Sequence, residues 1–207
     1  MEIETYPLGE MQTNAYLLAD SGEALIIDPA DEGGFLIQKV LERKLTCKYI
    51  LATHGHFDHL LGLLEVKLTF NCPFLIHRAD LPLLKRHSGT AAHFLEREVD
   101  PVPEPDGFLG QNQKIILGET TLRVLETPGH TLGSVSFYGD EALFSGDTIF
   151  AHGDTGRTDL PDGSEKKLTA SIQNKLLVLP GDTVVFPGHG PATTIGDFSL
   201  EWQARLS

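Results

Sequence analysis

The sequence predicts an α/β layered fold, and two patterns along its 207 residues lead to that prediction. Short apolar runs, bounded mainly by Gly, Pro and Asp, have the length and periodicity of β-strands. Segments between them carry apolar residues at a period near 3.6, which is typical of amphipathic helices. Strands that alternate with helices along a chain form sheets covered by helices.

The predicted strands fall into two sets. The first set occupies residues 2–8, 15–19, 24–28, 48–53 and 73–77. The second set occupies residues 113–117, 121–126, 135–138, 142–145 and 183–187. Both sets contain alternating or continuous apolar runs, as expected for strands buried on one or both faces.

Helices are predicted at residues 34–43, 60–69, 79–86 and 164–179. The segment 100–107, with sequence DPVPEPDG, is rich in proline and acidic residues, so we expect a surface loop rather than a linker between domains. Hydrophobic residues make up 41% of the chain and charged residues 22%, which is enough apolar material for a continuous core. We therefore expect residues 1–207 to form a single domain.

The charge balance restricts the partners of this domain. A net charge of -13 disfavours nucleic acid and anionic membrane surfaces, because both are bound mainly through Lys and Arg. The longest apolar runs fall far short of the ~20 residues that a membrane helix needs. The first residues are acidic where a secretory signal is basic, and Cys47 and Cys72 are too few for a disulfide framework. The expectation is a cytoplasmic protein that acts on a small molecule.

Three histidines and an aspartate lie within the run ATHGHFDHLLG, directly after a predicted strand. Residues at alternate positions project the same way, so His54, His56 and Asp58 can point at one spot, while His59 opens the next helix. A lone loop histidine is usually solvated, whereas this density of ligand types favours a metal site.

Further candidate ligands follow other predicted strands. His130 and His189 lie in the Gly-rich turns TPGHTLG and FPGHGPATT, and Asp147 follows the buried run ALFSGD. Small neighbours let the backbone turn sharply and approach an ion closely. Seven nitrogen and oxygen ligands without sulfur suit two cations such as Zn²⁺, Fe or Mn²⁺.

These motifs, T-H-x-H-x-D-H, P-G-H-T, S-G-D-T and G-H-G in that order, resemble the metallo-β-lactamase superfamily. Their spacing is most similar to its glyoxalase II-like, or hydroxyacylglutathione hydrolase-like, branch, from Asn14 to Gly196. The resemblance implies a four-layer αββα sandwich, in which two mixed sheets face each other with helices outside.

The resemblance also implies roles for the candidate ligands. His54, His56 and His130 would hold the first metal, and Asp58, His59 and His189 the second. Asp147 would bridge the two, and a bridging hydroxide would attack the substrate. Asp58 and Asp147 are the candidate catalytic residues, Asp58 because it would also orient the nucleophile. Zn²⁺ is the favoured ion, with Fe or Mn²⁺ as alternatives.

Two other residues are candidates for substrate binding. Arg157 offers a planar donor fork to a substrate carboxylate; the alternative is a buried ion pair with Asp159 that shapes the loop. His152 would narrow the cleft. Among the other histidines, surface or hydrogen-bonded positions are expected for His77 and His87.

The C-terminal helical region that supplies much of the glutathione pocket in full-length glyoxalase II is expected to be missing. The tail DFSLEWQARLS carries Phe198, Leu200 and Trp202, which suit docking on the same domain or on a neighbour in a homodimer.

The leading function is a binuclear metal-dependent hydrolase of a small ester or thioester, with S-acyl glutathione-like compounds as the best substrate class. The alternative is a mononuclear iron enzyme similar to persulfide dioxygenases, for which His54, His130 and Asp147 are the candidate ligands. A β-lactamase is disfavoured, because the familiar di-zinc enzymes use a cysteine ligand and a periplasmic signal. A non-catalytic metal-stabilised binding protein is disfavoured by the intact ligand set.

Overall fold

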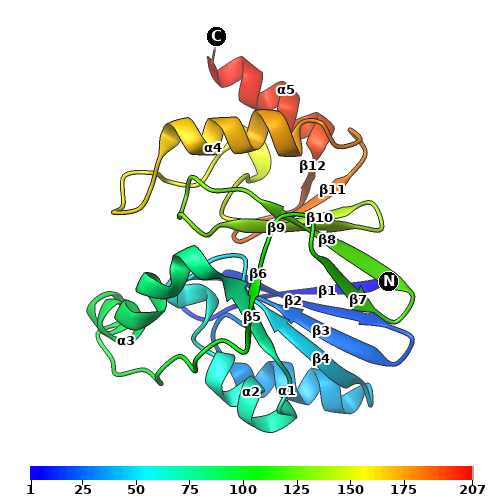
Figure 1. Ribbon diagram of the computed structural model, residues 1–207, viewed down its shortest axis with the longest axis vertical. Coiled ribbons are helices and arrows are strands. Elements are labelled where there is room, and N and C mark those ends of the chain that lie inside the picture. Colours follow the sequence, from blue (N-terminus) through cyan, green and yellow to red (C-terminus); the bar gives the residue numbers. More distant parts are fainter. Residues whose placement is uncertain (207) are drawn as a thin grey trace.

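Two mixed β-sheets lie face to face with helices on their outer faces in the computed structural model, which describes residues 1–206 (Figure 1). The layers run from α1 and α2, through the two sheets, to α4 and α5. This arrangement confirms the predicted four-layer αββα sandwich.

The first sheet has six strands in the order in which they occur along the chain. They are β1 (Glu2–Leu8), β2 (Thr13–Asp20), β3 (Glu23–Ile27), β4 (Thr46–Leu51), β5 (Phe74–His77) and β6 (Gly107–Leu109). The pairs β1–β2 and β2–β3 are antiparallel, and the pairs from β3 to β6 are parallel. Strand β2 is almost entirely buried on both faces, which explains its continuous apolar run.

The second sheet also has six strands, in the order β12-β11-β10-β9-β8-β7. They are β7 (Lys114–Leu117), β8 (Thr120–Glu126), β9 (Val135–Gly139), β10 (Ala142–Gly146), β11 (Val184–Pro187) and β12 (Thr193–Thr194). Strands β10 and β11 are parallel and the other pairs are antiparallel.

The helices cover the outer faces and one side of the sandwich. They are α1 (Gly33–Glu42), α2 (Leu63–Phe70), α3 (Leu81–Leu95), α4 (Glu165–Ser171) and α5 (Ile195–Leu206). Helix α4 continues into a wider π-helical turn, Ile172–Leu176. Short 3₁₀ turns occupy Phe57–His59, Arg78–Asp80 and Ala151–Gly153. No described helix has both the length and the apolar composition of a membrane span.

Three apolar clusters fill the spaces between the four layers. Leu36 of α1 packs in a cluster with Ile26 and Ile50 of the first sheet. Between the sheets the cluster includes Tyr16, Phe137 and Phe144, and beneath α4 and α5 it includes Leu168, Phe198 and Trp202. Each layer therefore buries apolar side chains against the next, which is what fixes the order of the layers.

The tail helix α5 packs against its own domain. Phe198 and Trp202 are buried, their rings stack with centroids 6.0 Å apart, and they join the cluster on the outer face of the second sheet. Two of the three side chains therefore dock on the same domain. Leu200 faces outward and is 71% exposed.

Helix α3 continues to Leu95, beyond its predicted end at residue 86. His87, Ala91 and Leu95, spaced four residues apart, form a buried stripe that the polar composition of the segment conceals. The expectation of a surface or hydrogen-bonded His87 is wrong, because the residue is 2% exposed and its Nδ1 has no hydrogen-bond partner among the described residues. The short strands β6 and β12 were also not predicted.

Candidate metal centre

The seven candidate ligands follow the carboxyl ends of strands from both sheets. His54, His56, Asp58 and His59 lie in the segment after β4, which includes the turn Phe57–His59. His130 follows β8, Asp147 follows β10 and His189 follows β11. The two sheets therefore bring residues that are far apart in sequence to one edge of the sandwich, where loops can carry polar groups on a rigid scaffold.

The first cluster consists of His54, His56 and His130. His56 Nδ1 lies 3.0 Å from His54 Nε2 and 2.9 Å from His130 Nε2. Burial and the neighbouring histidines lower the pKa of His54 well below its ordinary value, and burial with His130 lowers the pKa of His56 to about 4. Neutral imidazoles with converging nitrogens are the form that binds a metal.

Hydrogen bonds fix which ring nitrogen faces the centre in two of these histidines. Thr53 Oγ1 donates to Asp28 Oδ2 at 2.6 Å, so it accepts from His54 Nδ1 at 3.0 Å. His130 Nδ1 donates to the carbonyl oxygen of Arg157 at 2.8 Å. In both rings, Nε2 therefore keeps its lone pair and points at the cluster.

The second cluster consists of Asp58, His59 and His189. Asp58 Oδ2 lies 3.2 Å from His189 Nε2 and 3.5 Å from His59 Nε2, and it accepts a hydrogen bond from Thr13 Oγ1 at 2.9 Å. Burial opposes ionisation of Asp58, but His59 and His189 outweigh it and lower the pKa of the carboxyl. The cluster thus combines an ionised carboxylate with two imidazoles.

Asp147 lies between the two clusters. Its Oδ2 is 3.5 Å from His130 Nε2 and 3.7 Å from His189 Nε2, and its Oδ1 is 3.5 Å from His59 Nε2. Burial raises the pKa of Asp147, but the surrounding histidines lower it further than burial raises it. One carboxylate therefore reaches both clusters in its ionised form.

Two facing atoms show that a cation fits this centre. His59 Nε2 and Asp147 Oδ1 are buried and have no hydrogen-bond partner among the described residues. Burial lowers the pKa of His59, yet Asp58, Asp28 and Asp147 together raise it well above its ordinary value. The negative field that would hold a proton on His59 also favours a metal cation, which would satisfy both atoms.

Asp28 supports two of the candidate ligands, a role that was not predicted from the sequence. It is 1% exposed, accepts from the backbone N–H of Thr53 at 2.7 Å, and its Oδ2 lies 2.8 Å from His59 Nδ1. It therefore orients His59 directly and His54 through Thr53, as carboxylates behind metal-binding histidines do. An acid at the end of a fully buried strand was the available signal.

Gly188 allows the loop after β11 to lie close to Asp147 and His59. A Cβ at this position would collide with the Asp147 carboxylate and with the ring of His59. Only glycine therefore allows the loop that carries His189 to approach so closely.

The ligands open into a pocket of about 410 Å³. Its lining includes the candidate ligands His56, Asp58, His130, Asp147 and His189. An apolar wall continues outward through Met11, Phe57, Leu83, Phe94, Leu160 and Pro161. The rings of Phe57 and Phe94 stack with centroids 5.6 Å apart.

Arg157 lines the pocket, but its guanidinium is held by another residue. Its Nε and Nη2 donate to Asp159 at 2.8 and 2.7 Å, and both side chains are largely exposed. The structure thus shows the predicted alternative, an ion pair with Asp159, at the surface rather than buried. His152 is not brought into the pocket: its side chain is 76% exposed and lies 3.8 Å from Glu201.

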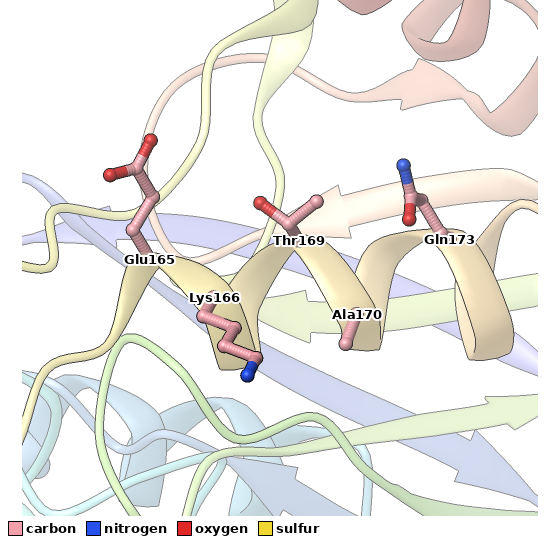
Figure 2. Close-up of a pocket in the computed structure, with 5 residues that line it drawn as sticks. All are labelled: Glu165, Lys166, Thr169, Ala170 and Gln173. Atoms are coloured by element: carbon pink, nitrogen blue, oxygen red, sulfur yellow. The ribbon is translucent and has the colours of Figure 1, made fainter.

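A second hollow, of about 470 Å³, lies along α4 and the π-helical turn that follows it (Figure 2). Its lining is Glu165, Lys166, Thr169, Ala170 and Gln173. None of these is a candidate ligand, so the chemistry belongs to the pocket that contains the histidines.

The fold and this centre define a class of metallo-hydrolases. The chain belongs to the metallo-β-lactamase superfamily, whose sequence profile matches residues 8–189. The probable metallo-hydrolase YqgX of Bacillus subtilis is 38% identical over 94% of this chain and 93% of its own length. The hydroxyacylglutathione hydrolase GloC of Haemophilus influenzae is 36% identical over 95% of this chain and 94% of its own.

Solved structures agree with this assignment. The B3 metallo-β-lactamase BLEG-1 superposes with a TM-score of 0.88 at 39% identity, covering 95% of each chain. TTHA1623 in a di-iron-bound form superposes with a TM-score of 0.86 at 36% identity, covering 96% of this chain and 98% of the other. A relative of this similarity with two metal ions agrees with a divalent metal centre here.

Proposed function

We propose that the protein is a binuclear metal-dependent hydrolase of small thioesters or esters. His54, His56 and His130 would hold one ion, and Asp58, His59 and His189 the other. Asp147 would bridge them. The observation that carries this proposal is the position of Asp147, whose two oxygens lie 3.5 to 3.7 Å from histidine nitrogens of both clusters.

When bound, two divalent ions would supply a water nucleophile of lowered pKa and would polarise the substrate carbonyl. The residues of the chain provide the rest. Asp58, fixed by Thr13, presents a carboxylate that orients the nucleophile. Asp58 and Asp147 offset part of the ~+4 charge of the ions. The apolar wall receives the organic part of the substrate and keeps bulk water from it.

We propose a thioester as the substrate class. A thiolate leaves with a conjugate-acid pKa of ~8.5 and needs little help from a general acid. GloC, which is similar over nearly the whole chain, is a hydroxyacylglutathione hydrolase, and this favours S-acyl glutathione-like compounds. Zn²⁺ is the proposed ion; the nitrogen and oxygen ligands suit it, but they also suit Fe and Mn²⁺, and the di-iron relative makes iron the alternative.

The test is metal analysis of protein purified without added metal, followed by parallel assays. The substrates are an S-acyl glutathione, a β-lactam, and a persulfide with oxygen uptake recorded. We expect two divalent ions per chain and thioester hydrolysis that a chelator abolishes and added metal restores. A single iron with persulfide-dependent oxygen uptake would replace the proposal by the mononuclear alternative, and faster turnover of the β-lactam would replace its substrate class.

A further inference from the structure

Asp80, outside the candidate ligand set, is a buried carboxylate at the start of α3. It is 1% exposed, and burial of a charged group is costly unless hydrogen bonds satisfy it. Three donors do so. Gly55 N and Thr131 Oγ1 donate to Oδ2, both at 2.8 Å, and Gly133 N donates to Oδ1 at 2.7 Å.

The donors belong to the two loops that form the first cluster. Gly55 lies between His54 and His56, Thr131 follows His130 directly, and Gly133 lies two residues beyond Thr131. Asp80 therefore joins loops that are far apart in sequence but whose histidines must meet. A backbone hydrogen bond from Val135 to Thr53, at 2.8 Å, is another link between the same segments.

Both loops lie against Asp80 with no room for a side chain between them. A Cβ at Gly55 would lie 3.1 Å from Asp80 Cβ, and a Cβ at Gly133 would lie 2.6 Å from Asp80 Cγ. The distance between the two loops is thus set by the width of one carboxyl group. Small displacements at this point would move His130 relative to His54 and His56.

Asp80 also connects these two loops to the apolar wall of the pocket. It is the residue before Leu81, the first residue of α3, and α3 contributes Leu83, Arg86 and Phe94 to the pocket. The same carboxylate therefore fixes the first cluster and the start of the helix that faces the substrate.

We propose that Asp80 is a positioning residue that holds His54 and His56 at metal-binding distance from His130 and aligns α3 with that centre. The inference rests on the proposed metal centre but not on the identity of the substrate.

The experiment compares Asp80→Asn with Asp20→Asn. Asp20, at the end of β2, also accepts two backbone N–H groups and a threonine hydroxyl, from Glu119 and Thr120, at 2.8 to 2.9 Å. It lies outside the candidate ligand set and the pocket, so it is a matched control for loss of the same kinds of hydrogen bond. Metal affinity is measured by titration with a competing chelator, and the melting temperature of each metal-free protein is recorded.

We expect Asp80→Asn to lower the affinity for one of the two metal ions by at least about tenfold. A loss of this size is typical when a group that supports the ligands is removed. Asp20→Asn should bind both metals like the wild type, even if its melting temperature falls as far. Equal metal affinities in the two variants would overturn the inference. Fewer than two metals in the wild type would instead overturn the proposed function.

If Asp80→Asn does not fold, Thr131→Val and Thr131→Ser replace it. The first removes one of the three donors and the second keeps the hydroxyl. We expect weakened binding of one metal in Thr131→Val and wild-type binding in Thr131→Ser. Wild-type binding in both would contradict the role of Asp80.

Discussion

The inner and outer halves of the pocket are held in place by different means. The inner half is the candidate ligand set, in which His54 and His59 are buried and are held by further buried groups such as Asp28. The outer half is the wall of α3 and the loop after Asp147, where Arg86 pairs with Asp162 and Arg157 with Asp159 in contact with solvent. Exposed ion pairs contribute little to stability. Buried groups therefore hold the candidate ligands, and the outer surface can change at its exposed ion pairs without disturbing them.

Removing individual histidines should have the largest effect and should separate the two metal positions. We expect His54→Ala and His130→Ala to lose one metal and His59→Ala and His189→Ala to lose the other, each with kcat at least ~10²-fold lower. Metal content and thioester turnover are the measurements. His152→Ala, outside the pocket, is the control and should match the wild type in both. Loss of both metals in all four variants, with the fold intact, would mean one cooperative site.

Acid should destabilise the outer half through His87. Burial lowers the pKa of His87 to about 4, below the ordinary histidine value of about 6.5. The unfolded chain therefore takes up this proton first, and stability falls as the pH drops from about 6.5 towards 4, by up to ~1.4 kcal/mol per pH unit. In His87→Leu, this part of the loss of stability between pH 6.5 and 4 should be absent. Above pH 6.5 the imidazole is neutral in both the folded and the unfolded chain, so the substitution should not act through protonation there. Denaturant unfolding of the metal-loaded proteins at several pH values measures the difference, and identical pH dependence in both proteins would refute the explanation.

Shortening the apolar wall should have a moderate effect confined to substrate binding. Phe94 is 58% exposed and stacks on Phe57, so Phe94→Ala should lower kcat/KM for a thioester with an apolar acyl group by about three- to tenfold. Metal content should not change. Ile116→Ala, at a similarly exposed apolar residue of β7, is the control. An unchanged kcat/KM in Phe94→Ala would show that the substrate does not reach this wall.

The smallest effect is expected for Arg157→Lys. The guanidinium pairs with Asp159 in solvent, and the contact with His130 comes from the backbone carbonyl, which the substitution leaves in place. We expect the free energy of unfolding to change little, because exposed ion pairs contribute little to stability. KM for an anionic thioester should rise less than about threefold, because the Arg157 guanidinium already pairs with Asp159. A much larger rise in KM would show that the substrate displaces Asp159 and would make Arg157 a recognition residue.

The sequence predicted the inner half far better than the outer half. His130, Asp147 and His189 each follow a strand end and a glycine. This local pattern identifies them without knowledge of the fold. Asp80 carries no such signal and Asp28 only its place at the end of a buried strand, because their roles depend on loops that only the packed sheets bring to them. His87 and His152 were misplaced for the same reason: one lies on a helix face whose partner is distant in sequence, and the other turns towards α5.

The central claim is that one carboxylate, Asp147, joins two metal positions. Native mass spectrometry of the wild type and of Asp147→Asn, with thioester turnover measured on the same samples, tests it most directly. Asparagine keeps the shape and removes the charge that offsets the repulsion between the ions. We predict two ions per chain in the wild type, one in Asp147→Asn, and a fall in kcat of at least ~10²-fold. Two ions and wild-type turnover in Asp147→Asn would contradict the account.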